Sequence, residues 1–136
     1  MITQKKIHLK ARKRGFHLIT DEILKHIDSL PETGLLNLFL HHTSAGLSIN
    51  ENCDPTVRYD METIANSLVP DSTTHYEHSL EGQDDMPAHF KSSMFGASIT
   101  IPISEHKLSL GTWQGIYLCE FRNYGGERLV TITIYN

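Results

Sequence analysis

The chain has 136 residues, of which 39% are hydrophobic and 21% charged, and its formal net charge at pH 7 is −4. This size and composition suit one globular domain over residues 1–136. No apolar run approaches the roughly 20 residues that cross a bilayer, and the N-terminus lacks a secretory signal, so we expect a cytoplasmic protein with no membrane partner. The two cysteines are too few for a disulfide framework.

The positive charge is uneven, because half of the twelve Lys and Arg residues lie within the first fourteen positions. Solvated lysines on an edge strand explain such a cluster, since they discourage edge pairing. A surface that contacts phosphate or RNA is the alternative. The negative net charge makes nucleic acid an unexpected partner of the whole molecule.

The first half of the chain predicts short strands and one clear helix. Strands are expected at residues 2–10, 16–20, 35–42 and 47–50, with a short helix capped by Thr20 between the second and third. Asp54 suits a helix cap and Pro55 the first helical turn. From there Val57, Met61, Ile64 and Leu68 form an apolar stripe.

The second half begins with a long polar segment, residues 71–86, of the kind that often carries function. A helix from Pro87 to Gly96 is expected next, with Asp84 or Asp85 as its cap. The last forty residues alternate in strand-like runs and predict an antiparallel meander with a hairpin at residues 123–126. The fold class is therefore α+β, with mostly antiparallel sheet and about three helices packed on it.

Nine histidines are many for this length, and imidazole is both a metal ligand and an acid–base group. In the strand at residues 35–42, alternation puts His42 on the face of Leu36, Leu38 and Leu40, and His41 on the opposite face. A hydrogen-bonded histidine at a strand end is the simple interpretation of either one. If the even-numbered face is the core, His42 lies where the core opens and is the better site residue.

The polar segment adds His78, and the next helix carries His89 near its start, where the helix dipole favours a neutral imidazole. His42, His78 and His89 would form a three-histidine metal site with an open position, as in catalytic zinc centres. Glu51 and Asp85 are candidates to orient a ligand or water as catalytic groups. Magnesium, which prefers oxygen ligands, is the alternative to zinc.

A glycine interrupts the strand pattern before Trp113 and Gln114. Two interpretations remain open: a bulge that buries Trp113 in the core, or a close backbone approach to a ligand that Gln114 would bind. Ser44, Lys91 and Arg128 join Gln114 as candidates for contact with a small anionic substrate.

Several blocks in this order resemble the YjbQ-like family, also labelled the secondary thiamine-phosphate synthase enzyme family. The resemblance covers essentially the whole chain from about residue 5. Its blocks are His42-Thr43-Ser44-Ala45-Gly46, Asn50-Glu51-Asn52 with Asp54-Pro55, His78 with Glu81-Gly82, Asp85-Met86-Pro87-Ala88-His89-Phe90-Lys91, and Leu110-Gly111-Thr112-Trp113-Gln114 with Glu120.

The resemblance implies a homotrimer, a site lined by His42, His78 and His89, and weak formation of thiamine monophosphate from a pyrimidine pyrophosphate and a thiazole phosphate. Two segments depart from the family pattern. His106 stands in a turn where many members have glycine, and residues 122–128 replace a short acidic turn that contains Gly and Pro. A different substrate preference follows if that segment lines the site.

Function is therefore expected to be metal-assisted transfer on a small anionic substrate. The chain lacks a phosphate-binding P-loop, which weakens the diphosphate reaction. A metal-dependent hydrolase of a small phosphorylated molecule is the first alternative, and a trimeric protein that binds a metal or ligand without catalysis is the second.

Overall fold

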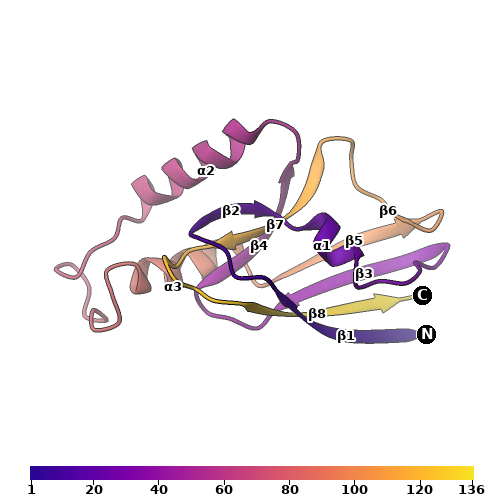
Figure 1. Ribbon diagram of the computed structural model, residues 1–136, viewed down its shortest axis with the longest axis horizontal. Helices are drawn as coiled ribbons and strands as arrows, with labels where there is room; N and C mark the ends of the chain where they lie inside the picture. The colour runs from indigo at the N-terminus through magenta and orange to yellow at the C-terminus, as the bar shows by residue number, and fades with distance from the viewer.

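Two antiparallel sheets form the body of the molecule, and two longer helices cover one side of it (Figure 1). The computed structural model describes residues 1–136. Its strands are β1 (Ile2–Leu9), β2 (Gly15–Leu18), β3 (Thr33–Leu40), β4 (Ala45–Glu51), β5 (Ser98–Ser104), β6 (Lys107–Leu108), β7 (Gln114–Glu120) and β8 (Arg128–Tyr135). Its helices are α1 (Thr20–Leu24), α2 (Pro55–Leu68) and α3 (Asp85–Phe95), so the α+β prediction is confirmed.

The main core lies between the two sheets. The larger sheet has the order β1-β8-β3-β5-β6, and the smaller one β2-β7-β4. Strand β3 shows why the sheets stack: Leu36, Leu38 and Leu40 are buried on one face, whereas Leu35 and Phe39 are exposed on the other. Burying one apolar face of each sheet stabilises the pair by roughly 25 cal/mol for every Å² removed from water.

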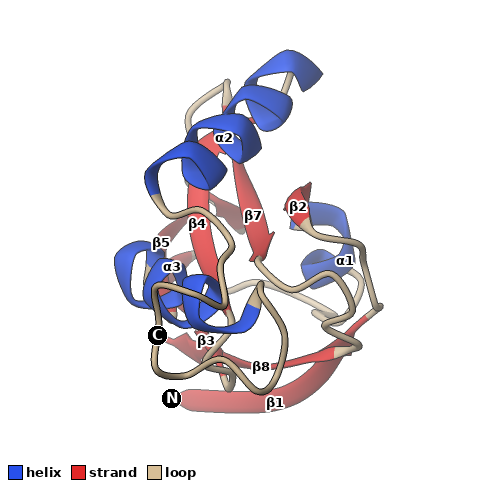
Figure 2. Cartoon of the chain, turned by 90° about the vertical axis from the view of Figure 1, so that its left-hand side faces the viewer, coloured by secondary structure: helices blue, strands red, loops and turns tan.

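A second, smaller core lies between the three-stranded sheet and the helices. Phe16 and Phe121 meet edge to face there with 6.0 Å between ring centroids, beside buried Tyr117. Helix α2 runs over this face of the sheet (Figure 2). The molecule is thus layered as large sheet, small sheet and helices, and no helix covers the outer face of the large sheet.

Helix boundaries follow local chemistry only in part. In α2 the Asp54 side chain accepts a hydrogen bond from the Thr56 amide, as the sequence predicted. Helix α1 is shorter than expected and ends at Leu24. Thr20 does not cap it, and its hydroxyl accepts a hydrogen bond from the Ile116 amide of β7. Part of the apolar stripe of α2 faces solvent, because Ile64 and Leu68 are 57% and 68% exposed. No helix has the length and apolarity needed to cross a membrane.

The predicted C-terminal meander is wrong. Strand β7 pairs with β2 and β4 in the small sheet, whereas β8 pairs with β1 and β3 in the large one. The segment between them turns the chain as predicted but passes from one sheet to the other. Turn residues specify a reversal of the backbone and not the sheet that the next strand joins. The strand predicted at residues 35–42 also ends earlier, at Leu40, which leaves both histidines of the doublet in a connecting segment.

Candidate functional site

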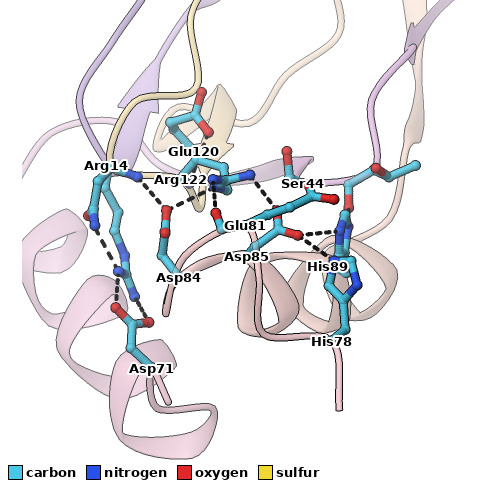
Figure 3. A network of polar contacts seen from close by, with 12 residues as sticks. Arg14, Ser44, Asp71, His78, Glu81, Asp84, Asp85, His89, Glu120 and Arg122 are labelled. Carbon is cyan, nitrogen blue, oxygen red and sulfur yellow. Dashed lines mark hydrogen bonds and ion pairs between the residues drawn. The ribbon is translucent and has the colours of Figure 1, made fainter. Parts of the chain in front are cut away.

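Three side chains converge at the start of α3: His78, Asp85 and His89 (Figure 3). Asp85 and His89 are four residues apart on one helix, so they lie one above the other on the same face. His78 reaches them from the long polar segment. The Nε2 atom of His78 lies 2.6 Å from Asp85 Oδ2, and the Nε2 atom of His89 lies 3.1 Å from the same oxygen. One potential ligand atom from each residue lies within 4.8 Å of the other two.

The hydrogen bonds of His89 determine its protonation pattern. Its Nδ1 lies 2.8 Å from the carbonyl oxygen of Thr43, which can only accept, so Nδ1 carries the hydrogen. In the neutral ring, Nε2 then has a lone pair that faces the Asp85 carboxylate. Two such groups repel unless a proton or a metal cation lies between them. Metal-binding histidines in proteins commonly donate their other N–H to a carbonyl in this way.

Arg122 contacts the Asp85 carboxylate on the side opposite the two histidines. The Asp85 side chain is 2% exposed, and Arg122 donates Nη1 to Oδ1, the oxygen that does not face the histidines. Burial alone would raise the pKa of Asp85, but the hydrogen bond from His78 and the positive charge of Arg122 outweigh it and hold the pKa below its ordinary value. The carboxylate is therefore ionised and oriented toward the two imidazoles.

Arg122 was missed as a site residue by the sequence reasoning. Its Nε donates to Asp84 at 2.9 Å, and its Nη2 donates to the Glu81 carbonyl at 3.0 Å, so one guanidinium ties the polar segment to the end of β7. The other end of that segment is tied by Arg14 to Asp71 at 2.7 Å (Figure 3). The departure of residues 122–128 from the family pattern pointed to this segment but did not single out Arg122.

His42 is not a member of this three-residue group. Its Nε2 accepts a hydrogen bond of 2.7 Å from the Leu129 amide, so in the neutral ring Nδ1 carries the hydrogen and neither nitrogen is free to bind a metal. Burial lowers the pKa of His42, and Arg128 lowers it further, which keeps the ring neutral. His42 and His89 nevertheless share the wall of one hollow of about 420 Å³, together with Thr43 and the end of α3.

Arg128 and Ser44 are engaged inside the protein. The Arg128 guanidinium forms a paired interaction with Glu120, with Nε 2.8 Å from Oε1 and Nη2 2.5 Å from Oε2. Nη2 also donates to the Ser44 hydroxyl at 3.1 Å. The Arg128 and Glu120 side chains are 5% and 0% exposed. The structure thus gives this arginine an internal partner, in place of the anionic substrate expected from the sequence.

Lys91 lies on the far side of α3 from the histidines. It is 1% exposed, donates to Asn66 of α2 at 3.2 Å, and lies 5.3 Å above the Phe121 ring. Burial lowers its pKa, and the charge of Arg14 acts in the same direction. Lys91 therefore joins α2 to α3 and does not reach the substrate side of the cluster.

Glu51 and Gln114 lie at the other end of the molecule. They pair with each other across β4 and β7. Glu51 lies six residues along β4 from Ala45, which follows two residues after Thr43, the hydrogen-bond partner of His89. At about 3.3 Å per residue this is roughly 20 Å. Within one chain, Asp85 alone of the two predicted catalytic carboxylates lies with the histidines.

The donor set favours some metals over others. Two imidazole nitrogens and one carboxylate oxygen are typical of zinc, manganese or iron sites and leave coordination positions open. Magnesium prefers oxygen ligands and water, so the residues present fit zinc better than magnesium.

The chain is similar over nearly its whole length to proteins of one family. The family model described as UPF0047 protein YjbQ-like matches residues 5–136. The UPF0047 protein YjbQ of Escherichia coli O157:H7 is 53% identical over 133 residues, 96% of each chain. The Salmonella typhimurium protein of the same name is 55% identical over 133 residues, again 96% of each chain.

A crystal structure shares the fold. An uncharacterised conserved protein of the yjbq/upf0047 family from Clostridium acetobutylicum superposes with a TM-score of 0.84 at 36% identity, over 96% of this chain and 99% of that one. These names state a family and no reaction. By its sequence match and its fold, this chain belongs to the YjbQ-like UPF0047 family.

Proposed function

We propose that the protein is a metal-dependent enzyme acting on a small phosphorylated molecule, with a divalent metal held by His78, Asp85 and His89. One observation carries the proposal: His89 donates Nδ1–H to the Thr43 carbonyl, and its Nε2 lies 3.1 Å from the buried Asp85 carboxylate, which His78 also contacts. A divalent cation would take the place of a proton between these groups, and zinc is the ion that the donor set suits best. Bound there, it would supply Lewis acidity to a substrate oxygen or to water.

The chain's own residues would do the positioning. Arg122 holds Asp85 in one rotamer from the side away from the histidines. The Thr43 carbonyl holds the ring of His89. His42, neutral and fixed through Nε2, lines the adjoining hollow, where its remaining N–H can donate to an oxygen of the substrate. The hollow has the volume of a small-molecule site.

Two reactions fit such a centre. The family resemblance implies transfer, in which the thiazole nitrogen attacks the pyrimidine methylene carbon and pyrophosphate leaves. A specific observation favours the second candidate, hydrolysis of a phosphorylated compound. A leaving pyrophosphate needs several cations around it, yet Arg122 and Arg128 are paired with carboxylates and Lys91 is buried.

We also propose that the protein works as a homotrimer in the cytoplasm. The outer face of the large sheet supports self-association, because Phe39, Leu35 and Tyr135 are 45%, 44% and 41% exposed on it and no helix covers them. Light scattering on the wild type beside Phe39→Asp tests this. A wild-type mass of one chain would contradict the trimer, and a Phe39→Asp variant that keeps the trimer mass would contradict this face as its interface.

Metal content tests the centre directly. Wild type, His89→Ala and His75→Ala are purified in parallel, supplied with zinc, dialysed and measured by elemental analysis. His75 is a matched control, because it is an exposed histidine of the same segment outside the cluster. We expect about one zinc per chain in wild type and His75→Ala and a loss of most of it in His89→Ala. Equal content in all three, or none in any, would reject the centre.

Product analysis separates the two reactions. The loaded protein is incubated with the pyrimidine pyrophosphate, with and without the thiazole phosphate. Thiamine monophosphate formed only with both substrates supports transfer, and orthophosphate released without the thiazole supports hydrolysis. If a loaded, folded protein turns over neither these compounds nor a panel of small phosphate esters, the enzyme proposal fails and ligand binding without catalysis remains.

A further inference from the structure

The loop between β6 and β7 displays a large aromatic side chain. Trp113 is the chain's only tryptophan and is 61% exposed, so the interpretation that buries it in the core is wrong. Figure 1 shows this loop beside the start of α2, at the end of β4 and β7 that is remote from α3. Exposed tryptophans are uncommon on surfaces that bind nothing, because burying the ring is so favourable.

The backbone around Trp113 is held in place by Asn52. The Asn52 amide donates to the Trp113 carbonyl at 2.8 Å. Its side-chain Nδ2 donates to the Thr112 carbonyl at 3.3 Å and to the Gln114 carbonyl at 3.1 Å. The Gln114 side chain accepts from the Gly111 amide at 2.7 Å. The indole is therefore carried by an ordered loop, which lowers the entropy lost when a ligand binds.

A hollow of about 470 Å³ lies beside the indole, which is ample room for one small ring system. Its lining residues are Leu18, Thr20, Asp21, Asn52, Cys53, Trp113 and Gln114. Gly115 allows them to converge: a Cβ there would lie 2.7 Å from Leu18 Cδ2 and 3.0 Å from Asn52 Cβ. Close packing around a glycine shapes this hollow, which is distinct from the histidine cluster.

Two free polar groups of the hollow are acceptors, and none carries a positive charge. Asn52 uses its Nδ2 in the loop, which leaves its Oδ1. The Asp21 carboxylate takes part in none of the chain's ion pairs. No lysine or arginine lines the hollow. An indole face and an unpaired carboxylate both attract positive charge and disfavour an anion.

We propose that this hollow is a binding site for a planar, positively charged nitrogen heterocycle, which stacks on Trp113 with its charge beside Asp21. An amino group on such a ring would donate to the Asn52 side-chain oxygen, and the free Nε2 of Gln114 would donate to a ring acceptor. The site lies roughly 20 Å from the histidine cluster along β4, so it stands whether or not that cluster binds a metal.

Two isosteric probes test the role of charge. N-methyl-4-aminopyridinium carries a permanent charge, and 4-methylaniline has the same shape without it at neutral pH. The full-length protein is titrated with each and followed by NMR at the indole N–H, which is a single resonance because the chain has one tryptophan. We expect a saturable shift with the cation, binding about fivefold to tenfold tighter than the neutral ring.

Variants assign the contacts. In Asp21→Asn the preference for the cation should fall to near parity, whereas Asp60→Asn, which removes an exposed carboxylate outside the hollow, should keep it. Trp113→Ala, followed by calorimetry, should lose binding, and Tyr124→Ala at another exposed ring should not. No saturable shift, equal binding of both probes, a preference retained in Asp21→Asn, or a shift produced by methyl glucoside or phosphate instead would overturn the proposal.

Discussion

Replacing Arg128 by methionine tests whether this arginine serves the fold or a substrate. The change removes both contacts to Glu120 and leaves a carboxylate with 0% side-chain exposure without a counter-charge. Breaking a buried pair in this way costs about 3–5 kcal/mol. For a chain of this size the melting temperature should fall by more than about 10 °C. The loss should shrink in Arg128→Met with Glu120→Gln, because the uncompensated charge is then gone.

The assay is urea unfolding at one protein concentration, as a double-mutant cycle over these two residues. Arg12→Met is the matched control: Arg12 pairs with Glu22 at 2.5 Å, but these side chains are 12% and 18% exposed. Because this pair is only partly buried, its loss should cost clearly less than the loss of the Arg128 pair. If Arg128→Met keeps wild-type stability and loses only affinity for an anion, the internal role is refuted and the substrate role is restored.

Three further predictions concern other parts of the fold. Burial lowers the pKa of His17 from its ordinary 6.5, so the unfolded chain binds more protons and stability falls as the pH drops from about 7 to about 5; His17→Gln should show a smaller fall in urea midpoints. Burial raises the pKa of the Cys119 thiol, and Cys53 is exposed. Iodoacetamide should therefore modify one cysteine in the native protein and two in urea, and two modified natively would contradict the packing. Gly34→Ala would place a Cβ 2.2 Å from the Tyr135 carbonyl oxygen, and it should lower the free energy of unfolding by about 1–3 kcal/mol. A variant with wild-type stability in thermal unfolding would contradict this close approach.

Part of the candidate site could be named from the sequence. The position of His89 near a helix start, Asp85 one turn before it, and His78 in a long polar segment are local features, and the structure gathers these three. The partners that hold them were not visible. Arg122 lies thirty-seven residues from Asp85, and nothing in its neighbours indicates that it turns toward that carboxylate.

His42 and Glu51 also show that local sequence patterns do not reveal contacts between distant segments. The sequence assigned both to one site, and the structure separates them from it. Alternation along β3 correctly put Leu36, Leu38 and Leu40 in the core, yet it could not show that the next even residue, His42, accepts a hydrogen bond from Leu129. Being close in sequence to a site block did not place Glu51 near it either. The two ends of strand β4, which has seven residues, lie roughly 20 Å apart along the sheet.

By itself the sequence determined the α+β class, most strand positions, the cap of α2 and the family. These depend on contacts within a few residues, where periodicity, proline and capping side chains act directly. Only the tertiary structure decided that β7 and β8 belong to different sheets, that Arg128 pairs with Glu120, and that Trp113 faces solvent. These depend on pairings between segments far apart in the chain, which local sequence patterns do not encode.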